Sequence, residues 1–314
     1  MINDLERAQP FNFRGAYPNL QQLLALRNYT PGLSLDTVVR TSTSAGNWQT
    51  RLRGRGLDFA EVRLYQAGDD IRNIDWRVTA KTQKTHTRLF SQERERPIIL
   101  AADLRSDMFF GTVNCFKSVA CAGFMAAIAW AALQSRDKVG GLVIGDNSHI
   151  EIRPKASRKV VLSYIHYLEQ YCQQLVSPIA TTVKQTLDQL LMKLQQVARP
   201  GSAVYIASDF HDIEAINKGR LLKLSQHCQV RFILVSDPLE WQLPENNLLQ
   251  ITDGHNTSEL SNKKQTYQHM QQRVKLIETL CKPLNIEIIQ LSTQDNLLAV
   301  LQQRFSTQLR KAKV

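Results

Sequence analysis

Hydrophobic and polar positions alternate in two regular ways from about residue 97 onward. Short apolar runs bounded by charged or turn-forming residues predict buried β-strands. These runs lie at 97–104, 138–146, 149–154, 202–210, 230–237 and 286–292. Segments with apolar residues at helical spacing lie at 115–134, 158–175, 182–197, 214–227, 263–280 and from about 296 onward. The pattern predicts a three-layer α/β fold, with a doubly wound, mostly parallel sheet between helices.

Two segments depart from this alternation in informative ways. Only the turn Gly145–Asn147 separates the second and third strands, which predicts an antiparallel pair. The longest apolar run, Val119–Leu133, is shorter than the roughly 20 residues that cross a bilayer. Because Lys117 and Arg136 flank it, this run predicts a buried core helix, and no membrane span is expected.

The chain before residue 97 has a different pattern. Residues 19–28 have the apolar spacing of a short helix. Residues 53–96 mix glycine, charged and aromatic residues without a long amphipathic period. We therefore expect three parts. They are a leader with a short helix at 1–35, an irregular extension at 36–96 that leans on the sheet, and the sheet domain at 97–314.

Composition and charge narrow the classes of function. The first residues lack the basic start and apolar stretch of a secretory signal, and the five cysteines form no C-x-x-C pair, which predicts a reduced, cytoplasmic protein. Lys and Arg number 39 against 28 Asp and Glu, a formal net charge of +11, which favours acidic partners. The basic residues are widely spread, and no aromatic-rich RNA-binding signature or zinc-finger spacing accompanies them. Nucleic acid is therefore the less favoured partner, and an ordinary basic surface stays open as an interpretation.

Three of the predicted strands end at or next to an aspartate. Asp103 closes the first strand, Asp209 lies at the end of a central one, and Asp237 closes the next. In the common strand order 3-2-1-4-5-6 these strands are neighbours, and their carboxyl ends meet at one rim of the sheet. Converging carboxylates need a proton or a cation. Mg²⁺ is one solution, and an arginine fork is the other.

At this rim the chain resembles von Willebrand factor type A domains. Their metal-ion-dependent adhesion site has D-x-S-x-S after the first strand, a threonine in a later loop and an aspartate after a central strand. The upstream segment 54–82, GRGLDFAEVRLYQAGDDIRNIDWRVTAKT, resembles the signature of the bacterial domain-of-unknown-function 58 (DUF58) family, as do SDF at 208–210, DPLEWQLP at 237–244 and TDG at 252–254. The resemblance implies a von Willebrand factor type A-like domain. It also implies a partnership with a MoxR-type AAA+ ATPase in chaperone-like or complex-assembly work.

The motif of this chain differs from the metal-binding pattern. Arg105 and Asp107 stand where the two coordinating serines belong, while Thr181 or Thr182 and Asp209 match the later positions. The guanidinium of Arg105 is permanently charged, so it can take the place of the cation beside Asp103. We expect a degenerate, metal-free site and no cofactor. Mg²⁺ held by Asp103, Asp107 and Asp209 is the alternative that stays open.

The signature segment is a second candidate site. Its residues of interest are Arg63, Asp69, Asp70, Arg72, Asp75 and Trp76. Because acids alternate with arginines, we expect ion pairs that hold the extension in place, with Trp76 packed on the sheet domain. The alternative is a metal site for phosphoryl chemistry. The density of paired charges also makes this segment a candidate functional surface.

These patterns together predict a non-enzymatic protein-binding module. Its rim would consist of Asp103, Arg105, Asp107, Thr181 and Asp209, with an exposed Arg105 receiving a carboxylate of the protein partner. No P-loop and no G-x-S-x-G elbow is present, so any ATP hydrolysis must come from the partner, whose client the sequence does not identify. Two alternatives remain, a metal-dependent phosphoesterase and a sequence-independent nucleic-acid binder.

Overall fold

A computed structural model gives the structure of the chain. It describes residues 13–35, 57–66, 69–92, 97–174, 185–241, 250–252, 257–259 and 263–306. Contacts divide the chain into two compact units. The larger unit comprises Met1–Thr37 and Arg96–Val314, and the smaller unit comprises Val38–Glu95.

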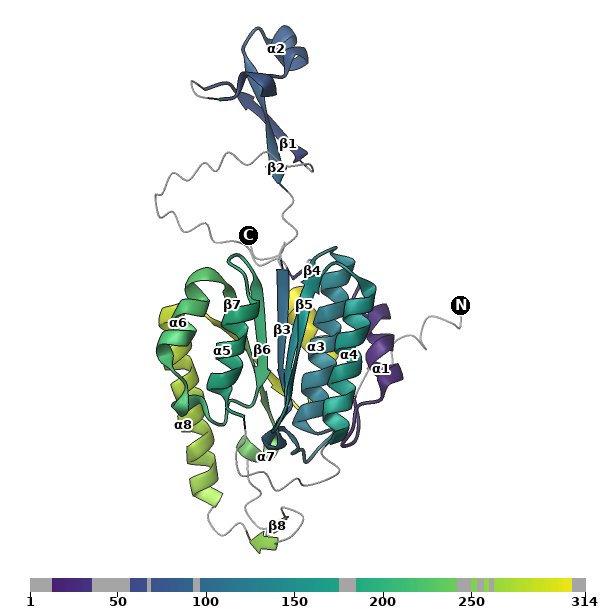
Figure 1. The fold of residues 1–314 in the computed structure, drawn as a ribbon, viewed down its shortest axis with the longest axis vertical. Helices are drawn as coiled ribbons and strands as arrows, with labels where there is room; N and C mark the ends of the chain where they lie inside the picture. Colours follow the sequence, from purple (N-terminus) through teal and green to yellow (C-terminus); the bar gives the residue numbers. More distant parts are fainter. Residues whose placement is uncertain are drawn as a thin grey trace. The chain divides into compact units, whose positions relative to one another are not determined.

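A six-stranded sheet forms the centre of the larger unit (Figure 1). Its strands, in the order β10-β7-β6-β3-β4-β5, are β10 (Glu287–Ser292), β7 (Gln229–Ser236), β6 (Ala203–Ser208), β3 (Pro97–Asp103), β4 (Lys138–Ile144) and β5 (His149–Lys155). All neighbouring pairs are parallel except β4 and β5, which are antiparallel. This is the predicted order 3-2-1-4-5-6, so the mostly parallel α/β fold is confirmed, including its antiparallel pair.

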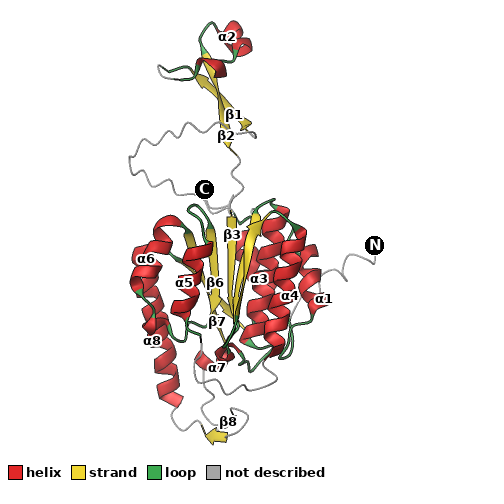
Figure 2. Cartoon of the chain, viewed as in Figure 1, coloured by secondary structure: helices red, strands yellow, loops and turns green. Residues whose placement is uncertain are grey.

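Helices cover both faces of the sheet (Figure 2). The elements on one face are α1 (Leu20–Ala25), α3 (Lys117–Gln134), α4 (Arg158–Gln173) and α9 (Leu297–Phe305). Those on the other face are α5 (Leu187–Val197), α6 (Lys218–His227) and α8 (Lys263–Cys281). Successive residues of β3 enter opposite cores, with Leu100 on the α3 side and Ile99 on the α5 side. Burial on both faces explains why the central strands are nearly continuous apolar runs.

The central helix α3 is the apolar run noted in the sequence. It is the single helix, within the residues the structure describes, that is long and apolar enough to cross a membrane, and 89% of that window is buried inside the unit. The burial agrees with the core helix that the flanking charges predicted. Glycine permits close packing nearby, since a Cβ at Gly141 on β4 would lie 2.3 Å from the ring of Tyr164 on α4.

The segment treated as a leader packs into the larger unit. Leu23 and Leu26 are fully buried in the core on the α3 side of the sheet. The indole Nε1 of Trp130, on α3, donates to the carbonyl of Leu23 at 3.2 Å. The described residues 13–35 thus belong to the fold of the sheet domain.

The smaller unit contains regular structure where the sequence predicted an irregular extension. Strand β1 (Leu57–Leu64) pairs antiparallel with β2 (His86–Gln92), and helix α2 (Trp76–Thr82) lies between them in sequence. The register shifts between Phe59 and Glu61, and this irregularity interrupts the two-residue alternation by which a strand is recognised. The prediction of an irregular segment was therefore wrong. Two further short strands, β8 (Gln250–Thr252) and β9 (Thr257–Glu259), form a small sheet of their own.

Candidate functional site

Acidic side chains converge at the carboxyl ends of three neighbouring strands. Asp103, Asp209 and Asp237 end or follow β3, β6 and β7, which pair in that order. Their exposed fractions are 1%, 3% and 0%. The hydroxyl of Ser208 connects two of these strand ends, because it donates to Asp103 Oδ2 at 2.6 Å. The strand order thus places the carboxylates on one rim, as the sequence predicted.

Arg105 occupies the centre of this rim. Its Nε and Nη2 donate to the two carboxylate oxygens of Asp103 at 2.9 and 2.7 Å. Its Nη1 and Nη2 donate to both oxygens of Asp212 at 2.9 Å. Nη1 also donates to the carbonyl of Gln185 at 3.0 Å, so all five N–H groups of the guanidinium have acceptors.

The expectation that an exposed Arg105 receives a carboxylate of the protein partner was wrong. Arg105 is 4% exposed, and its hydrogen-bond donors are all used within the chain. It therefore does not present a free fork to a carboxylate of a partner. Arg105 instead holds together three segments that are far apart in the sequence: the end of β3, the residue before the α5 cap, and the turn after β6.

Burial and pairing act in opposite directions on these groups. Complete burial raises the pKa of the Asp103 carboxyl, and the hydrogen bonds and charge of Arg105 oppose that rise. Burial would lower the pKa of the Arg105 guanidinium, but pairing with Asp103 and Asp212 outweighs it, and the pKa is raised. Burial alone would raise the pKa of Asp212, but hydrogen bonds from Arg105 and from the Leu187 amide bring it below its ordinary value. The arginine therefore stays charged at any physiological pH.

Lys117 is a second internal cation at the rim. It is the first residue of α3 and is 2% exposed. Its Nζ donates to Asp209 Oδ2 at 2.8 Å and to Glu240 Oε1 at 3.1 Å. Burial alone would lower the pKa of Lys117, but the charges of Asp209 and Glu240 outweigh that effect and raise it. Asp209 thus pairs with Lys117, whereas Asp103 pairs with Arg105.

The third strand-end carboxylate is satisfied by neutral donors. Asp237 accepts hydrogen bonds from the amide of Thr112 at 2.8 Å and from the hydroxyl of Thr293 at 2.6 Å. The hydroxyl of Thr112 and the amide of Leu239 also donate to it. Burial alone would raise the pKa of Asp237, but these donors, led by Thr112 and Thr293, lower it. Each of the three carboxylates therefore has its own partners within the chain.

A strained turn orients Asp209. Phe210 has a left-handed backbone with φ of 53°, a conformation that costs a bulky residue about 1–2 kcal/mol. The residue is fully buried, and its ring stacks on Phe232 with centroids 4.5 Å apart. Its amide donates to the hydroxyl of Ser208 at 2.9 Å. Packing and this hydrogen bond hold the turn that directs Asp209 toward Lys117.

Two predicted rim residues do not join the network. Asp107 is exposed in the 3-10 turn Ser106–Met108, and the described contacts of the rim do not include it. Thr181 and Thr182 lie outside the described residues. Asp107 therefore does not complete an anionic shell with Asp103 and Asp209.

The residues present do not fit a metal ion. Arg105 places its guanidinium against both oxygens of Asp103, the carboxylate that a metal would require. No group of three His, Cys, Asp or Glu side chains within the described ranges is arranged to hold a cation. A bound metal would also have to displace Lys117 from Asp209.

Several rim residues escaped the sequence analysis. Asp212, Lys117 and Glu240 were not among the predicted residues, although they pair with Arg105 or Asp209. Arg105 and Asp212 are 107 positions apart, and Lys117 and Asp209 are 92 apart, so no local spacing reveals either pair. A usable signal was the apolar helix α3 beginning with a lysine next to the predicted rim.

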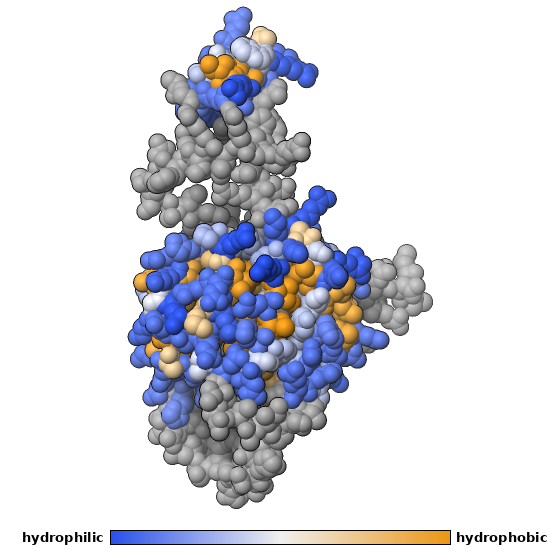
Figure 3. Space-filling model, viewed as in Figure 1, coloured by the Kyte–Doolittle hydropathy of each residue, from blue (hydrophilic) through white to orange (hydrophobic). Residues whose placement is uncertain are grey.

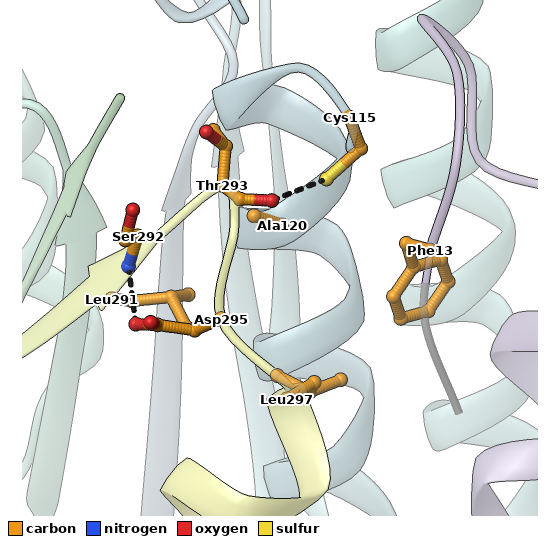
Figure 4. A pocket seen from close by; sticks show the side chains of 8 residues that line it. All are labelled: Phe13, Cys115, Ala120, Leu291, Ser292, Thr293, Asp295 and Leu297. Carbon is orange, nitrogen blue, oxygen red and sulfur yellow. Dashed lines mark hydrogen bonds between the residues drawn. The ribbon is translucent and has the colours of Figure 1, made fainter. Parts of the chain in front are cut away.

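A small cavity lies near this end of the sheet (Figure 4). Phe13, Cys115, Thr293 and Leu297 are among its lining residues, and the Cys115 thiol points at the Thr293 carbonyl. Its volume of about 10 Å³ has room for about one water. Burial raises the pKa of the Cys115 thiol to about 11, so the thiol stays protonated at neutral pH. This cavity does not accommodate an organic ligand.

The signature segment uses its acids locally. Asp69 pairs with Arg63 at 2.7 Å and accepts from the Gln66 amide at 2.9 Å. Asp70 caps the 3-10 turn Ile71–Asn73, and Asp75 caps α2. Trp76 is 67% exposed, so it is not packed within its own unit, and its packing on the sheet domain stays a prediction. The expected ion pairing thus reduces, in the part described, to Arg63 with Asp69.

A sequence model of the family described as "Protein of unknown function DUF58" matches residues 61–276, more than half of the chain. The chain belongs to the DUF58 family. Uncharacterized proteins of Mycobacterium bovis and Mycobacterium tuberculosis are 28% identical to it over 235 residues, which cover 73% of this chain and 68% of theirs. The DUF58 signature in the sequence thus indicated the family correctly.

Two solved structures are similar in part. The crystal structure of the SpRpn10 VWA domain aligns with a TM-score of 0.38 at 12% identity, over 67% of this chain and 95% of that domain. The crystal structure of an uncharacterized membrane-spanning protein from Vibrio fischeri aligns with a TM-score of 0.22 at 10% identity, over 70% of this chain and all of that one. The doubly wound, mostly parallel α/β fold of this DUF58 protein is established by its own strand order.

Proposed function

We propose that this DUF58 protein is a non-enzymatic, cytoplasmic protein-binding module that works with a MoxR-type AAA+ ATPase in chaperone-like or complex-assembly work. The partnership is what the resemblance to the DUF58 family implies, and the chain belongs to that family. One observation carries the non-enzymatic part: each carboxylate at the rim is neutralised or hydrogen-bonded within the chain. A rim of this kind fixes loops and leaves none of the three strand-end carboxylates, Asp103, Asp209 and Asp237, free to bind a catalytic metal or activate a water.

The same observation weighs against the phosphoesterase alternative. Metal-assisted phosphoryl chemistry needs at least one carboxylate that coordinates a cation with open positions for substrate. Asp103 and Asp209 are each within 2.8 Å of an internal cation. A metal ion at the rim would lie beside the two buried cations, Arg105 and Lys117. The repulsion between these like charges makes such a site electrostatically unfavourable.

Binding of the ATPase is the direct test. The full chain and a purified MoxR-type ATPase from the same organism are mixed, and their association is measured with and without ATP. We expect a complex, and phosphatase and nuclease screens with Mg²⁺ and Mn²⁺ should give no turnover above a protein-free control. No association, or turnover that is lost in an Asp103→Asn variant, would overturn the proposal.

A second experiment addresses the cation directly. Millimolar Mg²⁺ should leave the melting temperature of the wild-type chain unchanged. The matched control is Arg105→Ser/Asp107→Ser, which restores the D-x-S-x-S pattern and removes the internal cation. We expect Mg²⁺ to raise the melting temperature of this variant alone. A rise in the wild type that Asp103→Ala abolishes would mean that the rim binds metal after all.

A further inference from the structure

The smaller unit exposes large apolar side chains next to cations. Ile71 is 65% exposed and Trp76 is 67% exposed. Each is followed by an exposed arginine, Arg72 and Arg77. Figure 3 shows apolar atoms at the surface of the unit that contains β1 and β2, among hydrophilic neighbours. Large exposed apolar side chains grouped in this way are typical of interaction sites.

The acids of this segment are used within the fold. Asp70 accepts from the Arg72 amide at 3.0 Å, and Asp75 accepts from the amides of Arg77 and Val78 at 3.0 and 3.1 Å. Asp69 pairs with Arg63, as described above. The negative charges therefore cap turns and helices, and neither Asp70 nor Asp75 forms an ion pair with Arg72 or Arg77.

Among the described residues, the cations of this segment form no ion pairs other than that of Arg63. No ion pair in the described part of the chain involves the side chains of Arg72, Arg77, Lys81 or Lys84, and all four are exposed. Arg77 and Lys81 are four residues apart on α2 and thus share a helix face. Like charges at this spacing destabilise an isolated helix, so the arrangement is unfavourable for the unit by itself. An anionic partner would relieve the repulsion.

We propose that Ile71, Arg72, Trp76, Arg77 and Lys81, here called the 71–81 surface, form a docking surface for an acidic protein segment that also carries apolar side chains. Tryptophan and arginine are the residue types most enriched at energetically dominant positions of protein interfaces. The apolar pair anchors the segment, and the three cations select acidic sequences. The inference deepens the proposed function, because it names the surface that receives the protein partner.

The composition of the surface favours protein over nucleic acid. Single-stranded nucleic acid is bound by several aromatic rings that stack on successive bases along a basic groove. Trp76 is the one strongly exposed aromatic among the residues of this unit whose burial is described, and Ile71 provides no ring for stacking. An aliphatic side chain beside a tryptophan matches the apolar residues of a protein segment better.

The test compares the affinity of full-length variants for the MoxR-type ATPase. The variants Ile71→Ser/Trp76→Ser and Arg72→Glu/Arg77→Glu remove the apolar pair and reverse the charge. The matched control is Leu222→Ser/Lys223→Glu on α6, where Leu222 is 43% exposed and Lys223 is exposed. Circular dichroism and amide exchange in β1 and β2 confirm that the unit stays folded. We expect binding at least about tenfold weaker for both test variants and a change below about twofold for the control.

The outcomes separate this inference from the proposed function. If all variants bind the ATPase equally, the 71–81 surface is not the docking site, while the partnership stands. If the wild-type chain does not bind the ATPase, the proposed partnership is wrong. The 71–81 surface is then tested separately, with a direct probe of binding. That probe is a random copolymer of glutamate and tyrosine, with a poly-dT oligonucleotide for comparison, read by the emission of Trp76 after subtraction of a Trp76→Phe variant.

A blue shift of the Trp76 emission with the copolymer, weakened by Arg72→Glu/Arg77→Glu, supports the docking surface. A shift with the oligonucleotide alone, or with neither probe, overturns it. Self-association of the wild-type chain that Ile71→Ser/Trp76→Ser abolishes also overturns it, because the occupant would then be a second copy.

Discussion

The rim of the sheet and the 71–81 surface use charged residues in opposite ways. At the rim, Arg105 and Lys117 are at most 4% exposed, and both pair with carboxylates of the same chain. On the 71–81 surface the cations are exposed and form no ion pair with the residues that the structure describes, while the acids cap backbone amides. Buried charges need fixed partners, whereas exposed charges are solvated and free to meet a ligand. The cations of the rim thus stabilise the fold of this chain, whereas those of the proposed 71–81 surface are exposed to solvent.

The largest effect is expected when the central cation of the rim is removed. Arg105→Ala leaves the buried Asp103 and the partly exposed Asp212 without a counter-charge, which costs about 3–5 kcal/mol of unfolding free energy. Urea denaturation of the variant measures the loss. The control Lys223→Ala, at an exposed position on α6, should change stability by less than about 0.5 kcal/mol. Similar losses of unfolding free energy in the two variants would show that the buried ion pairs of Arg105 do not stabilise the fold more than an exposed charge does.

Variants of Lys117 can separate the energy of its ion pair with Asp209 from the energy of packing its side chain. Lys117→Met should destabilise the fold by about 3 kcal/mol, because Asp209 and Glu240 lose their shared cation. The double variant Lys117→Met/Asp209→Asn should recover part of that loss, since the uncompensated charge is then gone. A double-mutant cycle by chemical denaturation gives the coupling energy. Additive losses would show that Lys117 acts through packing and not through charge.

The dependence of the unfolding free energy on pH, below neutral pH, tests the hydrogen bonds of Asp237. Because its folded-state pKa is lowered, its contribution is present above about pH 4 and is lost as the pH falls through that folded-state pKa. Asp237→Asn should therefore cost about 1–2 kcal/mol at neutral pH, and the difference from wild type should shrink below about pH 4. Urea midpoints measured against pH show this directly. A constant difference at all pH values would mean that the carboxylate charge is irrelevant.

The smallest effect is expected in the smaller unit. The Arg63 and Asp69 side chains are 33% and 19% exposed, so Asp69→Ala should cost about 0.2–1 kcal/mol. Amide exchange of β1 and β2 detects the change, and it should diminish in high salt because exposed pairs are screened. The Arg105→Ala loss should change little with salt. Equal salt dependence at both sites would contradict the difference in burial.

The sheet could be predicted because each strand is marked by an apolar run within its own segment of the sequence. Apolar runs such as those ending at Asp103 and Asp237 bury both faces of a strand, and the order of such strands follows from the connecting helices. The convergence of the carboxylates followed from that topology. The starting points of several helices differ by a few residues from the predicted ones, as for α6, whose cap Asn217 follows an unpredicted 3-10 turn.

The pairing within the rim could not be predicted in the same way. The charge of Arg105 was evident from the motif, but its exposure depends on Asp212 and Gln185, which only the tertiary fold brings near. The exposure of Trp76 within its own unit could not be predicted for a related reason. An aromatic residue between charges can be an anchor or a contact surface, and burial, which sequence spacing does not encode, decides between them.

The arginine at the centre of the rim is bonded to the polypeptide, so it cannot dissociate as a bound ion can. Chelators, dilution and the supply of divalent metal in the cell leave such a counter-ion in place. The conformation of the loops that Arg105 holds therefore depends on the sequence alone and forms as soon as the chain has folded.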